Sequence, residues 1–138
     1  MKIQVLLFHI ILVIHSLLYA GSPKSPHTFL FCLKPELQPL EISFTRGKPS
    51  VGIVELDDYF ESNQVIHIEP WIKSATGTDR DGDIYLNRIY RVYLDETREM
   101  SIDQSIASIR TFPFILYSEP EYVRKLYSPL PNLLILLR

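Results

Sequence analysis

Few residues in this chain could perform acid–base or nucleophilic chemistry. A serine-hydrolase triad needs a nucleophile, a histidine base and an orienting carboxylate on one rigid scaffold. Beyond the first 20 residues, the histidines are His27 and His67. His27 lies in a proline-rich stretch, and His67 stands between Ile66 and Ile68 on an expected strand, which is typical of a surface-facing side chain. We therefore expect no catalytic residues and no enzymatic activity.

Cysteine and carboxylate spacing argue against a metal or redox cofactor. Cys32 is the only cysteine, which excludes an internal disulfide and a cysteine-based zinc or iron–sulfur centre. Its place in the apolar run Thr28–Leu33 predicts a buried strand residue rather than a nucleophile. Carboxylates alternate in Asp79–Asp83, but Gly82 comes too early for a calcium loop and no glutamate closes it. A solvated turn is the favoured interpretation, and we expect no cofactor.

Two further carboxylates have a spacing that suits binding. Glu119 and Glu121 flank Pro120 at the end of an apolar run. Residues at i and i+2 point the same way from a strand, and free helix N-termini attract carboxylates. The other interpretation is that both are exposed acids beside a proline turn.

The elements that position these residues follow from hydrophobic periodicity. In the first half, a strand is predicted at Thr28–Leu33, a helix over Val51–Ser62 and a strand at Val65–Ile68. A Glu-Pro pair closes that last strand, because proline lacks a ladder donor. The first half therefore reads as strand, helix, strand.

The second half repeats this plan. Ile84–Leu94 alternates over its whole length and is predicted to be one long strand. Ser101 and Gln104 have the capping-box spacing that begins a helix. Phe114–Tyr117 is the following strand, again closed by a Glu-Pro pair. The βαββαβ order predicts an α+β fold, the ferredoxin-like split βαβ sandwich, with an antiparallel sheet, two helices on one face and the other face open to a partner.

The beginning of the chain has the pattern of an export signal. Lys2 precedes the apolar run Ile3–Leu18, and small residues follow from Ala20. Cleavage after Ala20 is favoured, and the alternative is an uncleaved membrane anchor. Both interpretations place the rest of the chain outside the cytoplasm, secreted or in the cell envelope. A net charge of −2 without a basic block makes nucleic acid an improbable partner.

One long segment matches a family pattern, over Ile106–Ile109 and Phe114–Leu126. It resembles the N-terminal prodomains of subtilisin-like serine proteases, closest to those of secreted bacterial subtilases of the fervidolysin kind. Ile84–Glu96 looks like the strand before that helix, and Val51–Pro70 looks like the first helix and strand, so the resemblance covers about residues 28–128. Such prodomains act as folding templates and temporary inhibitors of the protease that follows them.

The resemblance also implies roles for residues near the end of the chain. Glu119 and Glu121 would cap two parallel surface helices of a protease. The segment from Tyr122 to Leu126 would enter the active-site cleft as an extended strand, the alternative being a plain linker. The residues expected to bind a protease are Tyr117, Glu119, Pro120, Glu121, Tyr122, Val123, Arg124, Lys125 and Leu126.

The sequence therefore predicts four segments and one function. They are a signal peptide over 1–20, a polar spacer over 21–27, a prodomain-like domain over 28–127 and an aberrant apolar tail over 128–138. Because this tail stands where the family continues into a catalytic domain, we expect a truncated or frame-shifted reading. The expected function is that of a prodomain, working as intramolecular chaperone and inhibitor of a subtilisin-like catalytic domain in cis or in trans, with no membrane contact after signal cleavage. The alternative is a freestanding extracellular ferredoxin-like protein-binding module unrelated to proteases, because fold alone does not fix function.

Overall fold

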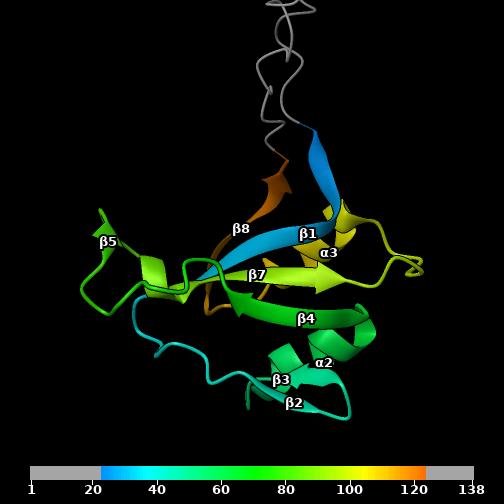
Figure 1. Ribbon diagram of the computed structural model, residues 1–138, viewed down its shortest axis with the longest axis horizontal. Coiled ribbons are helices and arrows are strands. Elements are labelled where there is room, and N and C mark those ends of the chain that lie inside the picture. Colours follow the sequence, from blue (N-terminus) through cyan, green and yellow to red (C-terminus); the bar gives the residue numbers. More distant parts are fainter. Residues whose placement is uncertain (1–22, 124–138) are drawn as a thin grey trace, which may run out of the picture. The chain divides into compact units, whose positions relative to one another are not determined.

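The computed structural model describes residues 23–123, and its compact unit spans Lys24–Glu121. The predicted signal peptide, the tail and three of the predicted site residues, Arg124, Lys125 and Leu126, lie outside the described residues. The elements in chain order are β1 (Lys24–Leu33), β2 (Ser43–Thr45), β3 (Lys48–Ser50), α2 (Val54–Ser62), β4 (Val65–Pro70), β5 (Arg80–Asp81), β6 (Ile84–Tyr85), the 3-10 helix η1 (Leu86–Arg88), β7 (Ile89–Leu94), α3 (Ile102–Ile109) and β8 (Ile115–Tyr122) (Figure 1). No helix among these residues is long and apolar enough to cross a membrane.

Four strands form one antiparallel sheet in the order β4-β7-β1-β8. β7 pairs antiparallel with β1, with Phe29 opposite Val92, and with β4, with Ile68 opposite Val92. The Lys34 N–H donates to the Phe114 carbonyl oxygen at 3.0 Å, next to the end of β1 and the start of β8. β4 and β8 are therefore the edge strands. The expected α+β class with an antiparallel sheet and two helices is confirmed.

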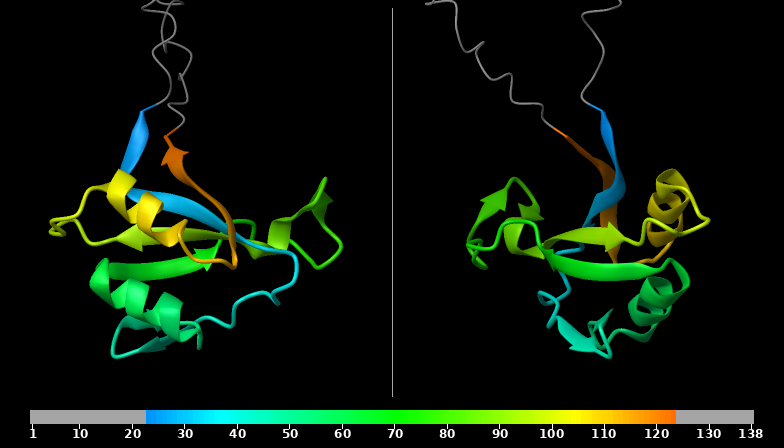
Figure 2. Two further views of the ribbon diagram at one scale, coloured as in Figure 1. Left: turned by 180° about the vertical axis from the view of Figure 1, so that it is seen from behind. Right: turned by 45° about the vertical axis from the view of Figure 1, so that its right-hand side comes forward.

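Both helices cover the same face of the sheet (Figure 2). The apolar core lies between that face and the helices. Phe31 and Tyr90 stack within it, with ring centroids 5.4 Å apart, and Tyr59 of α2 donates its hydroxyl to the Ser105 carbonyl oxygen of α3 at 2.7 Å. The most deeply buried residues of this core include Phe29, Phe31, Leu56, Phe60, Val92 and Ile109.

Local sequence explains where the helices begin. The Gln104 N–H donates to Ser101 Oγ at 3.3 Å and the Ser101 N–H donates to Gln104 Oε1 at 2.9 Å, so the predicted capping box is confirmed. The first helix starts at Val54, later than the predicted Val51. The Asp57 carboxylate accepts the Val51 N–H at 2.7 Å and holds the preceding residues in a turn. Gly52 permits that turn because its φ is +73°.

The prediction of one long strand over Ile84–Leu94 is wrong. The turn η1 interrupts it after two residues, and β7 begins at Ile89. A 3-10 turn rotates the chain and breaks the alternation of a strand. Ile84 and Leu86 consequently pack on the face away from the helices, whereas in one continuous strand they would lie on the same side as Tyr90.

The first and last strands in the chain, β1 and β8, are longer than expected. β1 begins at Lys24, before the predicted start at Thr28, and the Arg98 guanidinium donates to the Pro26 carbonyl oxygen in this added stretch. β8 continues through the second Glu-Pro pair to Tyr122. Proline is tolerated there because β8 is an edge strand, where a missing N–H leaves no ladder bond unmade.

Candidate protein-binding face

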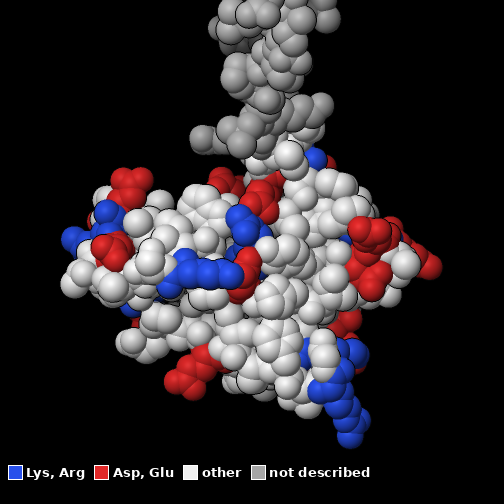
Figure 3. Space-filling view, viewed as in Figure 1, with Lys and Arg blue, Asp and Glu red and all other residues white. Residues whose placement is uncertain are grey.

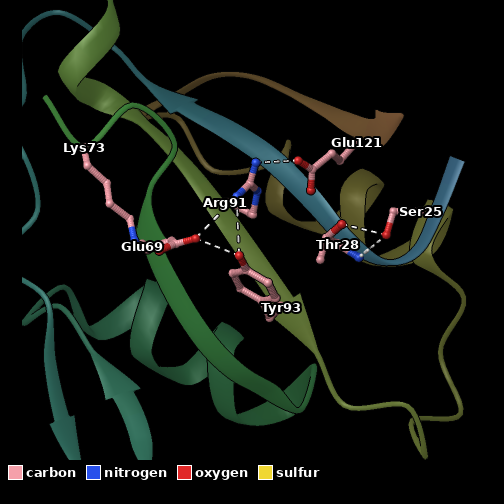
Figure 4. A network of polar contacts seen from close by, with 7 residues as sticks. All are labelled: Ser25, Thr28, Glu69, Lys73, Arg91, Tyr93 and Glu121. Carbon is pink, nitrogen blue, oxygen red and sulfur yellow. Dashed lines mark hydrogen bonds and ion pairs between the residues drawn. The ribbon is translucent and has the colours of Figure 1, made fainter. Parts of the chain in front are cut away.

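A chain of polar contacts crosses the sheet on the face away from the helices (Figure 4). Arg91 of β7 lies at its centre. Its Nη2 is 2.6 Å from Glu121 Oε1 on β8, and its Nη1 is 3.4 Å from Glu69 Oε1 on β4. One guanidinium therefore connects β7 to both edge strands. Figure 3 shows the result as oppositely charged side chains side by side across the middle of this face.

Glu69 is the most heavily bonded carboxylate on this face. The Tyr93 hydroxyl donates to its Oε1 at 2.7 Å, and Lys73 Nζ lies 2.8 Å from its Oε2. These hydrogen bonds from Lys73 and Tyr93 lower the pKa of Glu69 to about 2, against an opposing effect of burial. Glu69 is therefore fully charged at neutral pH and holds the Arg91 and Tyr93 side chains in place.

Aromatic rings extend the face beyond this network. The His67 ring stacks on Phe44 with centroids 5.3 Å apart and lies against Tyr93, also at 5.3 Å. Phe44 belongs to the β2–β3 hairpin and is 49 % exposed. His67 is exposed, as its alternation predicted. Partly exposed aromatic side chains provide large contact areas for a partner.

The other end of the face is covered by the chain itself. Ile84, Leu86 and Tyr117 pack against a small cluster made by Leu30, Cys32 and Ile89. Cys32 is completely buried, and burial raises the pKa of its thiol to about 11. The interpretation of Cys32 as a buried strand residue is therefore confirmed, and a protonated thiol is a poor nucleophile.

The predicted site residues of β8 have unequal environments. Tyr117 is partly buried beside Cys32, which removes much of its side chain from contact with a partner. Glu121 is held by Arg91, whereas Glu119 is exposed and makes no hydrogen bond or ion pair with another described residue. Pro120 is half-buried, and Tyr122 and Val123 are exposed. The two carboxylates are thus not equivalent: Arg91 fixes that of Glu121, whereas that of Glu119 is exposed to a partner.

The sequence reasoning did not select Arg91, Glu69, Tyr93, Lys73 or Phe44 as functional residues. A signal was present for two of them, because alternation along β7 puts Arg91 and Tyr93 on the side opposite Tyr90 and Val92. Glu69 was interpreted only as part of a pair that ends a strand. Its partners come from other strands and loops, which spacing along the chain does not show.

A groove of about 870 Å³ lies between the β2–β3 hairpin, α2 and the start of β4. Its wall contains both signs of charge, including Arg46, Lys48 and Glu61. Lys48 Nζ is 2.6 Å from Glu61 Oε1, so the charges of these two side chains neutralise each other. None of the predicted site residues lines the groove.

The aspartate-rich loop forms a turn. Asp79 accepts the N–H of Thr76 at 2.6 Å and its hydroxyl at 2.8 Å, which occupies one carboxylate oxygen within the chain. Within residues 23–123, no group of three or more His, Cys, Asp or Glu side chains is arranged to hold a metal ion.

Comparison of the chain with protein-family models, with curated proteins and with solved structures gives no significant match. A functional assignment therefore depends on the geometry of the sheet face and on the resemblance in the sequence.

Proposed function

We propose that this chain is a secreted prodomain that binds a subtilisin-like protease, assists its folding and inhibits it temporarily. The strand order β4-β7-β1-β8, with α2 and α3 as the connecting helices, supports the finer proposal of a ferredoxin-like split βαβ fold. That is the fold expected from the βαββαβ order of the elements in the sequence. The chain would act by binding, without catalysis.

One observation carries the proposal, namely the exposed carboxylate of Glu119 on the edge strand β8, two residues before the Glu121 of the polar network. Helix N-termini present unpaired N–H groups and a partial positive charge. Glu119 makes no hydrogen bond with another described residue, so it is available to accept these N–H groups from a partner helix. Arg91 holds Glu121 nearby in one orientation, which reduces the entropy lost on binding.

The proposed action has two parts. The sheet face covers two helices of the folded protease, and a ligand that binds only the folded state stabilises it by mass action. The segment from Tyr122 to Leu126 continues into the cleft and blocks it as an added strand. Residues 1–20 would direct export and be removed.

Inhibition of a secreted subtilase of the fervidolysin kind by residues 21–138 tests the proposal. Glu119→Ala should raise the inhibition constant by roughly fivefold or more, because a charge-assisted hydrogen bond contributes about 1–3 kcal/mol. Glu96→Ala is the control, since Glu96 is an exposed acid between β7 and α3, and it should change the constant by less than about twofold. Glu96 is a cleaner control than Glu61, which pairs with Lys48.

Equal effects of the two substitutions would reject the capping role of Glu119. Absence of inhibition by the unsubstituted chain would reject the prodomain function and favour the freestanding extracellular binding module. The aromatic rings of Phe44, His67 and Tyr93 favour that second candidate, because they lie on β2, β4 and β7 rather than on β8. N-terminal sequencing of the exported chain, expected to begin at Gly21, tests the signal peptide separately.

A further inference from the structure

Arg88 is a buried cation without an anionic partner. The residue is 9 % exposed, and its Nε and Nη1 atoms are buried and donate no hydrogen bond to another described residue. No ion pair connects it with another residue in the described range 23–123. Arginine is rarely buried to this extent unless it is paired, because removing a charge from water is costly when no opposite charge replaces the water.

Stacking fixes the position of this guanidinium without satisfying its donors. Its central carbon lies 4.2 Å from the centroid of the Tyr85 ring. A cation–π contact supplies no hydrogen-bond acceptor to the N–H groups, so Nε and Nη1 remain without one. A second cation, Arg80, lies 5.3 Å from the same centroid, and its Nη1 is 3.4 Å from the Tyr85 hydroxyl oxygen. Two guanidinium groups therefore share one aromatic ring.

Apart from the cation Arg80 at the Tyr85 ring, the groups on which the charge of Arg88 acts are neutral. Its charge acts on the Cys32 thiol and on the Tyr90 hydroxyl, and burial raises the pKa of both. The Tyr90 hydroxyl already accepts the Leu40 N–H at 2.6 Å. None of these groups supplies the negative charge that a buried guanidinium requires.

We infer that Arg88 is a binding site for a carboxylate ligand. A carboxylate offers two coplanar oxygens that match the planar fork of a guanidinium, and it carries the single charge needed to neutralise one cation. A doubly charged phosphate fits less well, because acidic residues nearby would repel its second charge. The charge of Glu119 acts on Tyr117 in the adjoining cluster, and Asp79, Asp81 and Asp83 come shortly before or after β5 or within it. The site does not depend on the protease-binding proposal.

The test is a titration of the full-length chain with formate at constant ionic strength, with chloride and inorganic phosphate as comparisons. Thermal midpoints should rise with formate and reach a plateau, because a ligand that binds only the folded state stabilises it. The ¹H–¹⁵N signal of the Arg88 Nε–H should shift with the same half-saturation. Formate acting like chloride in both measurements would overturn the inference, and so would tighter binding of phosphate than of formate.

Three variants sharpen the test. Arg88→Gln should abolish the saturable rise, and Arg88→Lys should weaken it by about tenfold, because lysine keeps the charge but loses the fork. Arg80→Gln is the matched control and should change the half-saturation by about twofold at most, since Arg80 is exposed. An equal rise in Arg88→Gln and in the unsubstituted chain would overturn the inference. If Arg88→Gln does not fold, the Nε–H signal of the unsubstituted chain decides.

The carboxylate could come from a small molecule or from an acidic side chain of another protein. Comparing acetate with a short blocked peptide that contains one aspartate distinguishes these sources. Tighter binding of the peptide would indicate a protein partner, and tighter binding of acetate would indicate a free carboxylic acid. Failure of both to bind would contradict the inference.

Discussion

The two faces of the central sheet differ in how their side chains are used. Under α2 and α3, the strands contribute apolar residues such as Phe29, Phe31 and Val92 to one continuous core. On the other face, Arg91 joins Glu69 and Glu121 across the strands. Packing there consists of the small cluster beside η1 and the partly exposed rings of Phe44, His67 and Tyr93. Burial of apolar area contributes most of the folding free energy, whereas partly exposed ion pairs contribute little. The helix face therefore stabilises the fold, and the polar face remains available for recognition.

Phe60 should give the largest effect, because it is 1 % exposed in the core under the helices. Phe60→Ala should lower the free energy of unfolding by ~3–5 kcal/mol, through lost apolar burial and a cavity. Urea denaturation of residues 21–138 measures this loss. A loss below about 1 kcal/mol would contradict the assignment of the core to this face.

Glu69 should give an intermediate and pH-dependent effect. Its pKa is about 2 in the folded chain and 4.5 ordinarily, so it is depressed on folding. The stabilisation is therefore present above about pH 4.5 and is lost as the pH falls towards 2. Lys73, the largest single cause of the lowered pKa, is 77 % exposed, so screening by solvent should reduce the stabilisation to about 1–2 kcal/mol.

Stability measured between pH 6 and pH 2 checks this prediction. Glu69→Gln should remove that part of the pH dependence, while Glu96→Gln should leave the curve unchanged. If the Glu69→Gln curve parallels that of the unsubstituted chain, the network does not contribute to folding.

Phe44 should give the smallest effect on stability, although the change is chemically identical to that at Phe60. Phe44 is 49 % exposed and stacks only on His67 among the aromatic side chains of the described residues. Phe44→Ala should cost less than about 1 kcal/mol in urea denaturation. A loss equal to that of Phe60→Ala would remove the contrast between the faces. The same variant should weaken binding to any partner of the polar face, measurable by calorimetry once that partner is known.

Features that depend on neighbouring residues could be predicted from the sequence. Ser101 and Gln104 specify the start of α3 because their side chains bond the backbone within one helical turn. Alternation puts Val92 and Arg91 of β7 on opposite faces, because successive side chains of a strand point in opposite directions, and the structure has Val92 in the core. The class of fold followed from the order of such local patterns.

Tertiary structure alone decided the turn before β7 and the polar network across the sheet. Residues Leu86–Arg88 alternate like a strand but form a turn, because Leu86 gains burial on the Leu30 and Cys32 cluster by leaving the helix side. Arg91 reaches Glu69, 22 positions away, only because β4 and β7 pair in a particular register. Glu121 completes that network because the sheet order puts β1 between β7 and β8 and the arginine side chain extends across it. Such contacts join residues that are distant in the chain, so the register and order of the strands determine them, and neither is encoded in the spacing of nearby residues.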